Sequence, residues 1–150
     1  LKKINAMIIK SIISLLCIVT VVYGMFKKSR LFFNLGYFIF GIFIVYDQLN
    51  LFIENNDIIH LSLASLWLIQ VALTYPNRLP PLTRDGSIIA KTAVPKIMIC
   101  LSIINFFGAY YVTLVDYIPI EAMYGHILLG LFPLFPAYMI LADKIEIIDN

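Results

Sequence analysis

The chain has 150 residues, of which 61% are hydrophobic and only 13% are charged, and its mean hydropathy is +0.92. A soluble domain is closer to half apolar and a quarter charged, so this composition excludes an ordinary soluble protein and indicates an integral membrane protein. The formal net charge is +2 at pH 7. The basic residues are few and flank hydrophobic segments, which argues against a nucleic-acid partner.

Five apolar runs follow one another along the chain, and each is close to the roughly 20 residues that a helix needs to cross the hydrocarbon core. Lipid cannot satisfy bare backbone groups, so each run is predicted to be a transmembrane helix. The runs cover residues 4–26, 31–53, 58–75, 94–115 and 122–142. The predicted fold class is therefore an all-α integral membrane protein, a single bundle of five transmembrane helices over residues 1–150.

Prolines modify two of these runs. Pro95 is expected to bend or break a short helix that ends at Val94, before the fourth run begins. Pro133 and Pro136 are expected to kink the fifth run.

Basic residues are unequally divided between the connections. With five crossings, most of the 11 Lys and Arg residues fall on the side that holds the carboxyl terminus. The positive-inside rule then predicts an amino terminus outside and a carboxyl terminus in the cytoplasm. The predicted location is a prokaryotic plasma membrane, with an organellar inner membrane as the alternative.

The connection between the second and third runs holds the densest polarity in the chain, with three acids, a histidine, three asparagines and a glutamine between residues 46 and 60. Intramembrane ionisable residues are costly and are treated as functional-site hypotheses. His60 and His126 both lie in the first turns of odd-numbered runs, so we expect them at similar depth. They could ligate haem, or a transition metal together with carboxylates. The available carboxylates are those of Glu54, Asp57, Asp116 and Glu121, of which Glu54, Asp57 and Glu121 are the predicted metal ligands.

The alternative reading of this cluster is structural. Each histidine then sits at headgroup level and bonds to water or to a backbone carbonyl. Asp57-x-x-His60 is the only local ligand spacing present, and it is a weak signal. The sequence requires no cofactor, and haem or a transition metal remains the alternative.

One intramembrane charge pair is predicted between the first two runs. Lys10 lies about six residues into the first run, roughly 9 Å deep, and Asp47 lies seven residues before Glu54, roughly 10 Å deep. The two charges therefore share a level, and pairing would offset part of their burial cost. The alternative is that the lysine stem extends outward to the interface by itself.

A polar face is predicted on the fourth run. It is formed by Ser102, Asn105, Thr113 and Asp116, which recur at helical spacing. The favoured reading is helix packing, because small and hydroxyl-bearing residues let membrane helices approach and hydrogen-bond across the seam. The alternative is a polar path through the protein.

Three further residues are predicted to pack inside the protein. Cys17 and Cys100 lie within apolar runs and are expected to be packed thiols rather than a disulfide. Trp67 lies in the middle of its run and is expected to pack against protein.

The leading functional hypothesis is a non-catalytic, accessory subunit of a larger membrane protein complex. The chain is small, has almost no soluble portion and carries runs that are apolar nearly all round. No Ser-His-Asp arrangement, glycine-rich phosphate loop or HExxH motif is present, so no catalytic residue is assigned. The expected partners are the lipid bilayer and other membrane subunits. The alternatives are a redox or metal-binding membrane protein that uses the histidine and carboxylate cluster, and a small solute or ion transporter.

Overall fold

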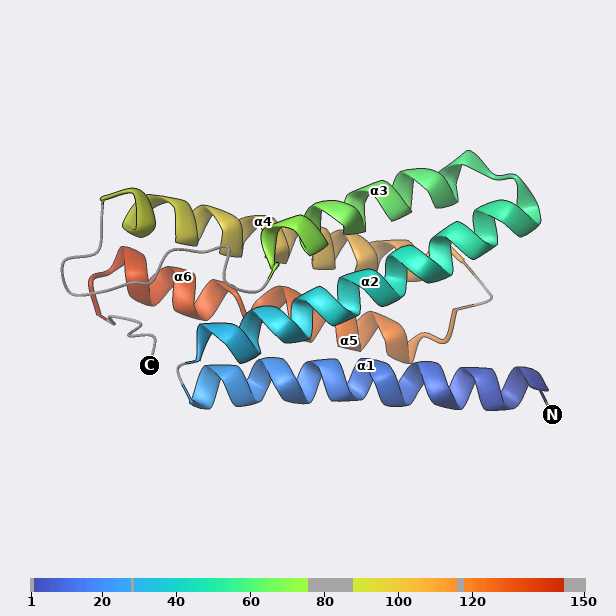
Figure 1. The fold of residues 1–150 in the computed structure, drawn as a ribbon, viewed down its shortest axis with the longest axis horizontal. Coiled ribbons are helices and arrows are strands. Elements are labelled where there is room, and N and C mark those ends of the chain that lie inside the picture. Colours follow the sequence, from blue (N-terminus) through green and yellow to red (C-terminus); the bar gives the residue numbers. More distant parts are fainter. Residues whose placement is uncertain (1, 28, 76–87, 116–117, 145–150) are drawn as a thin grey trace. The chain divides into compact units, whose positions relative to one another are not determined.

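The computed structural model describes residues 2–27, 29–75, 88–115 and 118–144 (Figure 1). Within these ranges every regular element is an α-helix, which confirms the all-α prediction. The helices are α1 (Lys2–Phe26), α2 (Arg30–Asn55), α3 (Ile58–Leu73), α4 (Ile88–Val112), α5 (Glu121–Leu131) and α6 (Leu134–Leu141).

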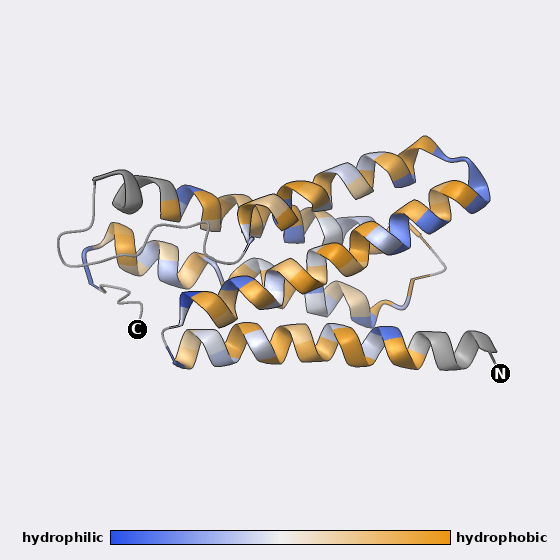
Figure 2. Ribbon diagram, viewed as in Figure 1, coloured by the Kyte–Doolittle hydropathy of each residue, from blue (hydrophilic) through white to orange (hydrophobic). Residues whose placement is uncertain are grey.

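Four helical segments of the described residues are long and apolar enough to cross a membrane. They are Ile8–Phe26, Arg30–Asn55, Val94–Val112 and Glu121–Leu141. The third predicted span forms α3, which has only 16 residues and so is about 24 Å long, less than the roughly 30 Å of the hydrocarbon core. Apolar residues cover most of each span, while the turn from α2 to α3 is hydrophilic (Figure 2). The structure supports an integral membrane protein, and a fifth crossing stays a prediction.

The chain divides into two compact units, Leu1–Arg78 and Leu79–Asn150. The first holds α1, α2 and α3, and the second holds α4, α5 and α6. Each unit is built from helices that are neighbours in sequence.

In the first unit α2 is the middle helix. It packs against both α1 and α3, and these two do not pack against each other over their described lengths. Glycines let both neighbours approach α2 closely. A Cβ added to Gly36 would lie 2.8 Å from the backbone oxygen of Cys17 on α1, and one added to Gly41 would lie 2.8 Å from Val71 Cγ2 on α3. These glycines therefore lie on two different sides of α2.

The predicted internal packing of two residues in this unit is confirmed. Trp67 is 2% exposed and Cys17 is 4% exposed. Cys100, in the second unit, is half-buried, and both cysteines are free thiols. The apolar interior of these helices therefore uses cysteine as a small hydrophobic residue.

In the second unit α4 packs along both α5 and α6. The two shorter helices make up the last candidate span, and the interruption between them falls at Phe132 and Pro133. Pro133 has no N–H to donate to the preceding turn, which accounts for an interruption at this point. The backbone of Phe132 and Pro133 stays in the right-handed helical region, so the chain continues in a helical sense across the break.

The break expected at Pro95 is wrong. A single helix runs from Ile88 to Val112 and contains Pro95. The proline removes one backbone hydrogen bond, but its own side chain and those of Val94, Met98 and Leu101 are buried. The residues around the proline are therefore packed, and their burial offsets the lost bond.

Candidate functional site: a polar clamp on the middle helix

The turn between α2 and α3 is built by two local devices. Asn56 adopts a left-handed conformation with φ of 52°, and its N–H donates to the Phe52 carbonyl at 2.7 Å, which ends α2. The carboxylate of Asp57 accepts the Ile59 N–H at 3.0 Å, which begins α3. The reversal places the last turns of α2 beside the first turn of α3.

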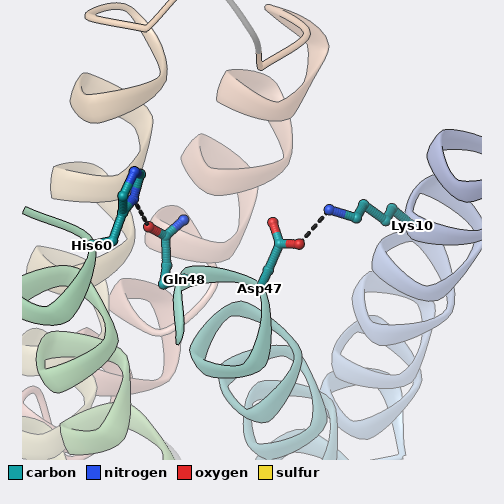
Figure 3. A network of polar contacts seen from close by, with 4 residues as sticks. All are labelled: Lys10, Asp47, Gln48 and His60. Atoms are coloured by element: carbon teal, nitrogen blue, oxygen red, sulfur yellow. Dashed lines mark hydrogen bonds and ion pairs between the residues drawn. The ribbon is translucent and has the colours of Figure 1, made fainter. Parts of the chain in front are cut away.

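Two consecutive residues of α2 reach different neighbours. Asp47 forms an ion pair with Lys10 of α1, through Oδ1 and Nζ. Gln48 Oε1 lies 2.8 Å from His60 Nδ1 of α3. Successive helical residues point about 100° apart, so one step along the chain turns from the α1 side to the α3 side (Figure 3). We call these four residues the polar clamp.

The two halves of the polar clamp differ in exposure. Gln48 and His60 are 6% and 5% exposed, whereas the side chains of Lys10 and Asp47 are 47% and 28% exposed. Because the Gln48 oxygen can only accept, His60 Nδ1 carries the hydrogen of this bond. The first half is thus a hydrogen bond inside the unit, and the second is an ion pair at its surface.

Lys10 and Asp47 are the charge pair that the sequence predicts, and the structure brings them together. Lys10 is eight residues from the start of α1 at Lys2, and Asp47 is eight residues from the end of α2 at Asn55. At 1.5 Å per residue, both charges lie about 12 Å along their helices from the same end of this hairpin. Equal depth is the reason that the pairing could be anticipated.

Further along the contact between α2 and α3 lie polar groups that the sequence reasoning missed. Gln70 Nε2 donates to the Tyr37 backbone oxygen at 3.0 Å, and Thr74 Oγ1 donates to the Gln70 backbone oxygen at 2.7 Å. Asn34 is 1% exposed, and its two amide atoms have no hydrogen-bond partner among the described residues. The available signal was a carboxamide deep inside an apolar run, Asn34 in the second run and Gln70 in the third.

The residues predicted to bind a metal are divided between the two units. Glu54 and Glu121 are exposed, and Asp57 is exposed and caps α3. His60 is bonded to Gln48, and His126 is buried in α5 of the second unit. No three His, Cys, Asp or Glu side chains of the described residues gather as a metal site would require.

Three residues of the polar face predicted on the fourth run donate hydrogen bonds to backbone carbonyls of the same run. Ser102 and Asn105 are buried and donate to the carbonyls of Met98 and Leu101, at 3.0 and 2.8 Å. Thr113 is exposed and donates to the Tyr110 carbonyl at 2.7 Å. Asp116 lies outside the described residues. Bonds of this kind satisfy a hydroxyl or amide inside an apolar setting, and they leave the helix surface able to pack.

Comparison of the chain with known protein families, with curated proteins and with solved structures found no match.

Proposed function

We propose that this chain is a non-catalytic subunit of a larger membrane protein complex, in which it serves as a structural or accessory component. The observation that supports this is how the polar side chains of the first unit are used. Asp47, Gln48 and Gln70 each link α2 to a neighbouring helix, and Asp57 caps α3. Polar groups engaged in this way hold helices together and do not form an open reaction site.

The apolar surface of α1 gives the same proposal a second basis. Within the first unit this helix packs against α2 and not against α3 over their described lengths. Large apolar side chains that are more than half exposed continue along it: Ile8, Ile9, Ile12, Leu15, Leu16 and Val19. Such a surface suits contact with lipid on some sides and with helices of other subunits on the rest.

The proposal includes a membrane orientation. We place the amino terminus outside and the carboxyl terminus in the cytoplasm, because most Lys and Arg residues then lie on the cytoplasmic side. The proposed location is a prokaryotic plasma membrane, with an organellar inner membrane as the alternative.

The experiment is a native mass measurement after extraction of the protein in its own lipid, without detergent. We expect an assembly that contains this chain and at least one other polypeptide in a fixed ratio. A lone species of 17.1 kDa would refute the proposal. Metal analysis and an absorption spectrum of the same sample test the redox alternative, which would require a bound species that disappears in both His60→Ala and His126→Ala.

A tryptophan scan of α1 makes the test specific. A tryptophan at a lipid-facing position is tolerated, whereas one at a partner-facing position clashes with the partner. We expect some of Leu15→Trp, Leu16→Trp and Val19→Trp to release the other polypeptide while the helix content of this chain is unchanged. Release by none of the exposed α1 positions would place the contact elsewhere and remove the support that α1 gives to the proposal.

A further inference from the structure

The ion pair of the polar clamp has hydrogen-bonding capacity that the described residues do not use. An ammonium group has three N–H donors and a carboxylate has two acceptor oxygens. In the described part of the chain, Lys10 Nζ meets Asp47 through Oδ1 alone. Two donors and one carboxylate oxygen are therefore left to face the surroundings, on side chains that are 47% and 28% exposed.

These open groups lie within candidate membrane spans, in Ile8–Phe26 and Arg30–Asn55. Their exposed neighbours include Ile9 and Tyr46, which are 57% and 66% exposed. Charged groups that face lipid without a hydrogen-bond partner are unfavourable, because they have lost their water. Intramembrane charges therefore commonly pair with other polar groups. A partner that carries both a cation and an anion would satisfy the open groups of Asp47 and Lys10 together.

We propose that the exposed side of the Lys10–Asp47 pair is a contact between two copies of this chain. A two-fold axis along the membrane normal preserves depth, and the two charges lie at equal distances of about 12 Å from their helix ends. Lys10 of one copy then faces Asp47 of the other, and the reverse contact follows by symmetry. The four charges close into a ring with no net charge, in which the open carboxylate oxygen of each Asp47 accepts an N–H of the facing Lys10.

Charge complementarity favours a second copy over a lipid headgroup. A phosphate would satisfy Lys10, but it would be repelled by the carboxylate of Asp47, which is paired with that lysine. A second copy supplies both signs at the required depth without any further assumption. This inference goes beyond the proposed function, because it concerns the number of copies and holds whether or not other polypeptides are present.

The test uses two charge reversals in full-length chains that carry two different affinity tags. Lys10→Asp gives an acidic chain with two carboxylates at the site, and Asp47→Lys gives a basic chain with two ammonium groups. Pairs of tagged chains are expressed together, and capture through one tag is followed by measurement of the other. We expect wild-type chains to capture each other, acidic–acidic and basic–basic pairs to be reduced at least about fivefold, and the acidic–basic pair to recover.

Two further variants keep the test decisive if a single reversal prevents folding. The double reversal Lys10→Asp/Asp47→Lys keeps an internal ion pair and should capture itself as wild type does. The neutral double variant Lys10→Met/Asp47→Asn avoids repulsion, and we expect its helix content to be unchanged and its self-capture to fall about fivefold. Undiminished self-capture by the neutral variant, or an acidic–basic pair no better than the two like pairs, would overturn the inference. The proposed function would be untouched by that result, since it is tested by the presence of a different polypeptide.

Discussion

The contact between α1 and α2 should be more sensitive to an added methyl group than the contact between α2 and α3. A Cβ on Gly36 would lie 2.5 Å from Val21 Cγ2, 2.8 Å from the Cys17 backbone oxygen and 3.0 Å from the Val21 backbone nitrogen. A Cβ on Gly41 would lie 2.8 Å from Val71 Cγ2, and its next neighbour, Gln70 Nε2, is 3.5 Å away. Backbone atoms cannot rotate aside, so α1 must retreat in the first case, whereas only one side chain must adjust in the second.

The expected magnitudes follow from these distances. Comfortable contacts between carbon atoms are about 3.5–4.0 Å, and forcing an extra methyl group into a packed interior costs about 1–3 kcal/mol. Alanine regains up to about 1 kcal/mol over glycine inside a helix. We therefore expect Gly36→Ala to lower the free energy of unfolding by about 1–2 kcal/mol. Gly41→Ala should change it by less than about 0.5 kcal/mol, because a rotamer adjustment of Val71 costs only about 0.5–1.5 kcal/mol before that gain.

The measurement is equilibrium unfolding in mixed micelles of increasing SDS content. It is followed by circular dichroism and by the fluorescence of Trp67, the only tryptophan in the chain. Gly41→Ala serves as the matched control, since it makes the same change on the same helix. The reasoning fails if Gly36→Ala is as stable as wild type, or if Gly41→Ala is the more damaging of the two.

Two other predictions concern the ion pair and the topology. Lys10→Met and Asp47→Asn should each lower the stability in micelles by about 0.2–1 kcal/mol, and the double variant should cost less than the sum of the singles, whereas strict additivity would deny any coupling. Cysteines introduced at Asn55 and Ile118 should react with an impermeant thiol reagent from outside the cell and one at Asn77 should not, and the reverse labelling would invert the proposed orientation.

The helices could be predicted from the sequence because apolar length decides them. The predicted first two runs, 4–26 and 31–53, differ by no more than two residues at either end from Lys2–Phe26 and Arg30–Asn55. The fourth run, 94–115, begins at the same residue as the candidate span Val94–Val112. The short helix expected before it is instead continuous with it, because the buried residues around Pro95 keep the helix intact. The hydropathy of the chain and the position of a proline do not show whether the residues around that proline will be buried against other helices.

The contacts between helices could be predicted only where depth alone was sufficient. Lys10 and Asp47 share a level, so their pairing followed from a count of residues. The bond between Gln48 and His60 depends also on how α2 and α3 are rotated about their own axes, which packing decides. Asp57 was considered as a metal ligand, but an aspartate just before a helix commonly caps it, and that is its role here.

The bond between Gln48 and His60 provides a prediction that separates a lost hydrogen bond from a lost side chain. Both residues are buried, so Gln48→Leu would leave the His60 Nδ1–H without its acceptor and should cost about 1–3 kcal/mol in the free energy of unfolding. The double variant Gln48→Leu/His60→Leu removes both polar groups, and an apolar pair of similar shape can be nearly neutral. We therefore expect the double variant to be more stable than Gln48→Leu alone.

The matched control for this cycle is Asn50→Leu, which also replaces a carboxamide on α2. Asn50 is half-buried and its side chain makes no hydrogen bond with another described residue, so its replacement should change the stability by less than about 0.5 kcal/mol. SDS unfolding of all four variants, including His60→Leu, gives the coupling energy directly. If the double variant is less stable than Gln48→Leu, the bond does not hold α3 against α2. The histidine would then contribute through its shape alone, and the polar clamp would be reduced to its charged half.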